Sequence, residues 1–194
     1  MKSLLILLVS LAGLFSPAVS ARTFLWQSSV TNFGRWYGSS SLWNTGTNDI
    51  PNAPGDDVVI LPGNDGTGVC ILGGDGISNS VTIGELHFGH TNNLFTINRE
   101  TTPAKALILD NSNEMARIVV SNAVDARIRG DWIDRLLIEI YLADDLEINV
   151  REFNMDREFL LAAPIVFSSG DIYKTGPGIL EWQSEHLNYQ YTGT

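Results

Sequence analysis

Short runs in which apolar and polar residues alternate constrain this chain more than any other feature. In one run, Ile138, Ile140 and Leu142 alternate with Glu139 and Tyr141. A period of two is typical of a β-strand with one buried and one solvated face. Such runs recur roughly every ten residues with turn residues between them, which predicts an all-β fold. A sandwich, a barrel and a parallel β-solenoid share this pattern.

A turn at Pro54–Asp57 leads into the apolar run Val58–Leu61, after which short strands fill the chain. One segment also fits a helix, because Trp132, Ile133, Leu136, Leu137 and Ile140 form a helical stripe that Asp131 could cap. The alternation through Leu142 favours a strand there. The expected strands are Val69–Leu72, Val81–Phe88, Leu94–Ile97, Ala106–Leu109, Arg117–Val120, Leu136–Leu142, Leu146–Val150, Ile165–Phe167 and Ile179–Trp182.

The N-terminus has the pattern of a secretory signal peptide. Lys2 precedes the apolar run Leu4–Val9, Pro17 ends the apolar segment, and Val19-Ser20-Ala21 supplies the small residues of a cleavage site. The run is shorter than the roughly 20 residues that span a bilayer. We therefore expect cleavage after Ala21, export to the extracellular space or outer cell surface, and no membrane span in the mature chain.

Charge and cysteine content exclude several functional classes. The 194 residues include 22 acidic and 12 basic side chains, for a net charge of −10. Nucleic-acid binding needs clustered Lys and Arg, so we expect no nucleic-acid partner. The single cysteine, Cys70, excludes an internal disulfide framework and a cysteine-rich zinc site.

The C-terminal segment carries a family resemblance. Lys174-Thr175-Gly176-Pro177-Gly178 precedes an apolar run, and the sequence continues to Tyr191-Thr192-Gly193-Thr194. This resembles the autotransporter-associated β-strand repeat, in which a Lys-Thr-Gly-Pro-Gly turn, an alternating strand and a Tyr-Thr-Gly-Gly-Thr ending follow one another. Here the strand reads Ile179–Ser184 rather than Thr-Leu-Thr-Leu-Ser-Gly, and Gly193 replaces the double glycine.

The front of the chain resembles the leader that precedes such repeats. The matching segments are Gly34-Arg35-Trp36, Leu42-Trp43-Asn44 and Pro54–Ile60, and Val81–Gly89 is similar to one solenoid rung. The resemblance implies a right-handed parallel β-helix, a bacterial surface or extracellular location, and no catalytic residues or cofactor.

These observations predict four segments. Residues 1–21 are the signal peptide, 22–57 an aromatic, turn-rich N-terminal cap, 58–169 the β-solenoid rungs, and 170–194 a repeat that we expect to be incomplete. Further repeats would follow it. The alternative is a self-capped end, for which Trp182, Leu187, Tyr189 and Tyr191 offer apolar surface.

The candidate binding residues are aromatic. Trp26, Trp36, Tyr37 and Trp43 could form a platform for a sugar, although clustered aromatics at the start of a solenoid more often close its core. His87 and His90 would face opposite sides of a strand, and the Asp-rich turns complete no known calcium loop, so we expect no metal site.

Catalysis is not expected from the carboxylates. Glu139, Asp144 and Asp145 could be considered as an acid/base set, but no basic partner is placed beside them in the sequence. The main prediction is a non-enzymatic, structural or adhesive segment whose partners are extracellular polysaccharide or cell-surface components. The alternatives are a polysaccharide-degrading β-helix enzyme and a carbohydrate-binding module.

Overall fold

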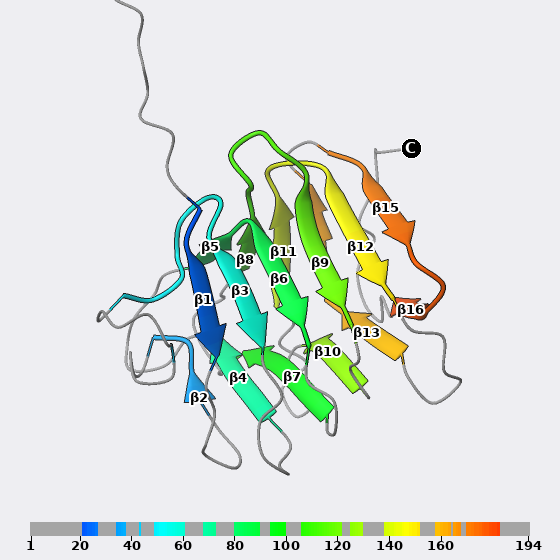
Figure 1. The fold of residues 1–194 in the computed structure, drawn as a ribbon, viewed down its shortest axis with the longest axis horizontal. Helices are drawn as coiled ribbons and strands as arrows, with labels where there is room; N and C mark the ends of the chain where they lie inside the picture. The colour runs from blue at the N-terminus through cyan, green and yellow to red at the C-terminus, as the bar shows by residue number, and fades with distance from the viewer. Residues whose placement is uncertain are drawn as a thin grey trace, which may run out of the picture.

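The chain forms three β-sheets (Figure 1). The computed structural model describes residues 21–26, 34–37, 43, 49–60, 68–72, 80–89, 94–99, 106–121, 125–129, 138–151, 158–163, 165–167 and 170–182. Every regular element in these ranges is a strand, which confirms the all-β prediction. All strand pairs within the sheets are parallel.

Each sheet is built from strands that are far apart in the sequence. Sheet A has the order β1 (Thr23–Trp26), β3 (Asp57–Ile60), β6 (Glu85–Phe88), β9 (Ala116–Val120), β12 (Leu146–Val150) and β15 (Ile172–Thr175). Sheet B has the order β2 (Gly34–Arg35), β4 (Gly68–Leu72), β7 (Leu94–Arg99), β10 (Asp125–Arg129), β13 (Glu158–Ala162) and β16 (Ile179–Trp182). Sheet C has the order β5 (Val81–Ile83), β8 (Ala106–Leu109), β11 (Glu139–Leu142) and β14 (Ile165–Phe167).

The chain visits the sheets in a fixed sequence. From β3 to β14 it enters sheet A, then sheet B, then sheet C, and returns to sheet A beside the strand it left. We call each such circuit a pass. Because successive passes pair in register, every sheet grows by one strand per pass, and equivalent side chains form columns across the sheet.

Apolar side chains form the inward-facing columns. In sheet A, Leu86 pairs with Val58 and Ile118, and all three are fully buried. Burial of each such side chain stabilises the fold by about 1.5–3 kcal/mol. The equivalent columns of the other sheets include Ile97 and Ile128 in sheet B, and Leu107 and Ile140 in sheet C.

One expected strand is two strands in the structure. The segment Val81–Phe88 divides at Gly84 into β5 in sheet C and β6 in sheet A. A Cβ atom at position 84 would collide with Asn111 Oδ1 and lie 2.8 Å from the Gly55 Cα atom. The Gly84 N–H donates to the Asp56 carbonyl at 2.8 Å. Glycine therefore permits a tight corner where the alternation suggested a continuous strand.

The helical interpretation of the segment around Leu136 is not seen in its described part, because β11 is a strand. Residues 130–137 lie outside the described ranges. Five strands were not among those expected from the sequence: β1, β2, β10, β13 and β15.

Candidate functional site

A polar column runs across the outer face of sheet A. The side chains of Leu86, Ile118 and Ile148 point inward. Because successive side chains of a strand point to opposite faces, the residues that precede them point outward. In the strand register, Glu85 pairs with Arg117, and Arg117 pairs with Glu147. The three side chains therefore lie beside one another, although Glu85 and Arg117 are 32 positions apart in the sequence.

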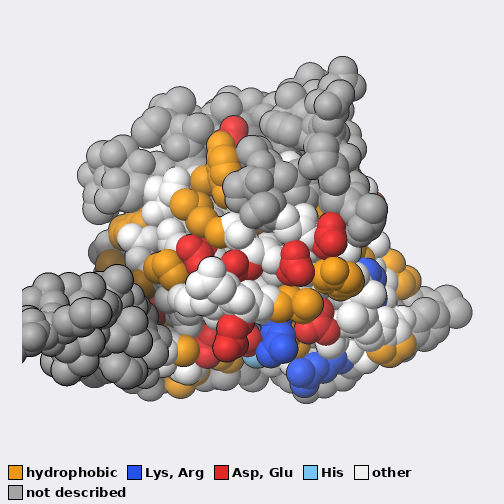
Figure 2. All heavy atoms as spheres, turned by 90° about the horizontal axis from the view of Figure 1, so that it is seen from above, with side chains coloured by type: hydrophobic (Ala, Val, Ile, Leu, Met, Phe, Trp, Pro, Cys, Tyr) orange, Lys and Arg blue, Asp and Glu red, His pale blue; other side chains and the backbone are white. Residues whose placement is uncertain are grey.

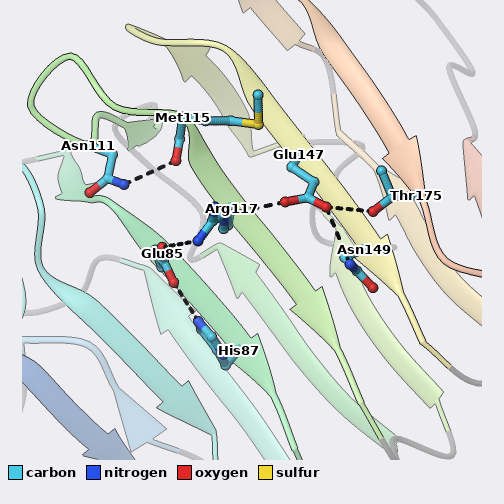
Figure 3. Close-up of polar contacts among 8 residues, drawn as sticks. All are labelled: Glu85, His87, Asn111, Met115, Arg117, Glu147, Asn149 and Thr175. Atoms are coloured by element: carbon cyan, nitrogen blue, oxygen red, sulfur yellow. Dashed lines mark hydrogen bonds and ion pairs between the residues drawn. The ribbon is translucent and has the colours of Figure 1, made fainter.

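Arg117 bridges two carboxylates (Figure 3). Its Nη1 lies 3.3 Å from Glu85 Oε1, and its Nε lies 3.3 Å from Glu147 Oε2. The arginine side chain is 48% exposed, whereas the two glutamates are 17% and 20% exposed. Exposed pairs of this kind contribute about 0.2–1 kcal/mol each, so the bridge fixes geometry more than it adds stability.

Neutral partners extend this network along the face. Thr175 Oγ1 donates to Glu147 Oε1 at 2.7 Å, and Asn149 Nδ2 donates to the same oxygen at 3.3 Å. His87 Nε2 lies 2.8 Å from Glu85 Oε2. We call Glu85, His87, Arg117, Glu147, Asn149 and Thr175 the sheet A network. It joins β6, β9, β12 and β15.

Hydrogen bonding favours the charged forms of both glutamates. The bond from Thr175, with further contributions from Asn149 and Arg117, lowers the pKa of Glu147. The contact with His87 and the charge of Arg117 likewise lower the pKa of Glu85. At a given acidic pH, each of these carboxylates is therefore ionised to a greater extent than an unperturbed glutamate.

Asp57 is a carboxyl with the opposite tendency. It pairs in register with Glu85 on the neighbouring strand. Desolvation, followed by the charge of Glu85, raises the pKa of Asp57. The outer face of sheet A thus holds two adjacent carboxyls whose surroundings push their pKa values apart.

A buried ion pair fixes the start of sheet A. Asp56 is 1% exposed and accepts hydrogen bonds from Arg22 Nε at 3.0 Å, Arg22 Nη2 at 2.8 Å and the Asn52 N–H at 3.0 Å. The Asp56 hydrogen bond raises the pKa of Arg22. A buried carboxylate needs such compensation, so this pair is a structural clamp between β1 and the turn before β3.

Three of the four aromatic candidates are buried together. Trp26, Trp36 and Trp43 are each at most 2% exposed. The Trp43 ring centroid lies 4.8 Å from that of Trp26 and 4.9 Å from that of Trp36. Trp36 Nε1 donates to the Pro51 carbonyl at 2.8 Å. Their rings contact one another, so no indole face among these three is open to a sugar.

Tyr37 is half-buried at the edge of this cluster. Its hydroxyl donates to the Ser80 carbonyl at 2.9 Å, and burial raises the pKa of the phenol. The four residues proposed as a platform are thus close in space, and packing within the fold covers the ring faces of the three tryptophans.

The repeat-like turn at Lys174, Gly176, Pro177 and Gly178 connects β15 to β16. Gly176 has φ +73°, and a Cβ atom there would collide with the Val150 carbonyl oxygen. That oxygen instead accepts the Gly178 N–H at 2.8 Å. Lys174 Nζ donates to the carbonyls of Thr175 at 2.7 Å and Gly176 at 2.9 Å. The motif therefore makes a tight corner that docks on the preceding pass.

Two of the remaining carboxylate candidates bond to turn residues, and the third bonds within β11. Asp144 Oδ2 accepts the Asn111 N–H at 2.6 Å, and Asp145 Oδ1 accepts the Asp171 N–H at 2.9 Å. Glu139 accepts the Tyr141 hydroxyl at 3.0 Å. The face of the molecule seen in Figure 2 has several acidic side chains among hydrophobic ones. A shallow hollow of about 320 Å³ is lined by Asn113, Glu114, Met115, Ala143, Asp144, Asp145 and Gly170.

Within the described ranges, no three His, Cys, Asp or Glu side chains are grouped so that they could hold a metal ion. No helix with the length and apolar character of a membrane span occurs in the part of the chain that the structure describes. Residues 1–20 of the expected signal peptide lie outside the described ranges. No protein-family model, curated protein or solved structure matches this chain.

Proposed function

We propose that this chain is a non-enzymatic, exported segment of a bacterial surface or extracellular protein with a structural or adhesive role. Its architecture would be a right-handed parallel β-solenoid. The observation that carries this proposal is the recurrence of one strand order in three parallel sheets, with each pass in register on the one before. Stacked passes of this kind give a rigid rod with long, regular faces.

The aromatic cluster supports the proposal that the first pass caps the N-terminal end of the solenoid. Trp43 forms an antiparallel bridge with Trp26 and packs edge-on against it, with an angle of 77° between the rings. Phe24 also packs against Trp43, with ring centroids 6.4 Å apart. An aromatic N-terminal cap would shield the apolar columns from water at the end where the rod begins.

Export and surface location rest on the signal-like N-terminus and on the resemblance to autotransporter-associated repeats. The partners would be extracellular polysaccharide or cell-surface components. The outer face of sheet A is the surface best suited to them, because its polar side chains are held in fixed positions by the sheet A network.

A second candidate function is cleavage of a glycosidic bond at Asp57 and Glu85. Asp57 and Glu85 pair in register on neighbouring strands, whose backbones lie about 4.8 Å apart, and retaining glycosidases likewise use two closely spaced carboxyls. The raised pKa of Asp57 suits a general acid, and the lowered pKa of Glu85 suits a nucleophile. These pKa directions favour Asp57 and Glu85 as the two carboxyls of such a site.

One assay distinguishes these functions. The mature chain is incubated with a panel of polysaccharides, and binding and product release are scored separately. A structural segment gives no products, and an adhesive one binds without turnover. An enzyme releases reducing ends, and then Glu85→Gln abolishes release while Glu147→Gln, the matched variant on the same face, retains it. Product release lost in Glu85→Gln would overturn the non-enzymatic proposal.

A further inference from the structure

The two ends of the stacked sheets differ in how their inward residues are covered. In the first pass, Phe24 and Trp26 are 1% and 2% exposed beneath Trp43. In the last pass, Trp182 is 44% exposed, although it pairs in register with the fully buried Leu161. Among the described strands, β15 and β16 each have a neighbour on one side only.

Trp182 belongs to a set of inward positions that lack a full covering. Ile172 pairs with the fully buried Leu146, and Leu180 pairs with the fully buried Phe159. Both residues of the last pass pack on the core but are only partly buried. The apolar columns of sheets A and B therefore continue to β15 and β16 and remain partly in contact with solvent there.

Lys174 gives this end a specific charge. It pairs in register with the fully buried Ile148, so it occupies an inward column in which the preceding residues are apolar. Its ammonium group donates to two carbonyls of the adjoining turn. Among the described residues, no carboxylate lies within ion-pair distance of it. Partial desolvation lowers the pKa of Lys174.

We propose that β15 and β16 form a docking surface for a further pass of parallel β-strands that carries a carboxylate in register with Lys174. Apolar side chains of the incoming pass would lie beside Ile172, Leu180 and Trp182. This inference rests on the solenoid architecture proposed above and adds the partner and its recognition chemistry. The new contact would continue the β12–β15 and β13–β16 pairings already present in the fold.

Two features make a further pass a better occupant than the first pass of a second copy. Trp43 bridges to Trp26 at the start of sheet A and is itself only 2% exposed, so a head-to-tail contact would find no open apolar column there. The chain also carries a net charge of −10, so two copies repel each other. A segment that offers one carboxylate to Lys174 and apolar residues to its neighbours does not bring the closed aromatic end against β15 and β16.

The test uses the full mature chain and synthetic peptides with the sequence of residues 144–167. Such a peptide contains a complete pass, and position 148 would fall beside Lys174 if it added in the native register. One peptide carries Ile148→Glu and the other Ile148→Lys. Binding is measured by titration, and hydrogen–deuterium exchange locates it. We expect slower exchange of the β15 and β16 amides, and binding of the Glu peptide about threefold tighter than the Lys peptide.

A charge reversal in the protein completes the experiment. Lys174→Glu should reverse the preference between the two peptides, while Arg151→Glu makes the same change in net charge and should keep it. Three results would overturn the proposal: no protection of β15 and β16 with either peptide, equal binding of both peptides, or full protection of these amides in the chain alone, which indicates that the chain covers its own end. Distances between spin labels placed along sheet A test the solenoid architecture separately. Failure of the docking surface can therefore be distinguished from failure of the solenoid.

Discussion

Arg22 and Asp56, 34 positions apart in the sequence, form a two-point ion pair whose carboxylate is almost fully buried. The arginine Nε donates to Oδ1 at 3.0 Å and its Nη2 donates to Oδ2 at 2.8 Å. The same guanidinium lies 4.9 Å from the centre of the Phe24 ring. Arg22 also directly follows the expected cleavage site, so its side chain would remain in the mature chain.

Removal of this arginine should destabilise the fold, because it leaves the Asp56 carboxylate buried without its cation. For Arg22→Ala we expect a loss of about 2 kcal/mol in the free energy of unfolding, measured by urea denaturation. Asp49 lies 3.6 Å from Arg22 Nη1 and is 58% exposed. Asp49→Asn is therefore the control and should cost less than about 0.5 kcal/mol. Equal losses in the two variants would contradict the clamp.

The aromatic cluster should contribute more than the exposed tryptophan at the other end. Trp36 is fully buried and its indole N–H is bonded to Pro51, so Trp36→Phe loses both volume and a hydrogen bond. We expect a cost of about 2 kcal/mol. Trp182→Phe is the matched change at a 44% exposed position and should cost less than about 0.5 kcal/mol. Urea unfolding followed by circular dichroism measures both, and a larger effect at Trp182 would be inconsistent with this structure.

Gly176 should tolerate no side chain. Its φ of +73° and the proximity of the Val150 carbonyl oxygen predict a loss of about 1–3 kcal/mol for Gly176→Ala. At Gly89 a new Cβ atom would only meet the Ile60 carbonyl oxygen, at an ordinary 3.5 Å. Gly89→Ala should therefore change the melting temperature by much less. A neutral Gly176→Ala variant would show that the corner is not formed as described.

Acid should weaken the sheet A network. The folded-state pKa of Glu147 is lowered, so its contribution to stability is fully present above the pKa of the unfolded chain and is lost as the pH falls through the folded-state value. Wild-type protein should therefore lose about 0.5 kcal/mol more than Glu147→Gln between pH 6 and about pH 3. Urea denaturation at several pH values measures this difference. Parallel pH profiles for the two proteins would contradict the proposed role of the charge.

Local patterns in the sequence predicted strands where apolar residues alternate clearly, and β9, β11, β12 and β16 lie within or close to the expected ranges. They did not reveal β15, because Lys174 occupies an inward position in it. In β10, Ala126 and Ile128 do alternate with arginines, but a single large apolar residue gives a weak signal. That strand is defined by its pairing with β7 and β13.

The polar network could not be predicted from local sequence. Glu85 and Arg117 meet only because two strands from successive passes pair in one register, and a slip of one strand by one residue would turn its side chain to the other face of the sheet. For a similar reason, the sequence alone does not decide whether the tryptophans are buried or exposed. A cap and a sugar platform use the same residues, and only tertiary packing decides which ring faces are covered.

The central claim is that successive passes stack in register, and a distance between spin labels tests it most directly. Thr23 and Tyr173 lie in one outward column of sheet A, at its first and last strands. With Cys70 replaced by Ser, nitroxide labels are attached to cysteines introduced at both positions, and a second protein carries them at Thr23 and Glu147. Double electron–electron resonance should give backbone separations of about 24 Å and 19 Å, differing by one strand spacing of about 4.8 Å. Distances that do not increase by one spacing from the shorter to the longer pair would contradict the stacked architecture.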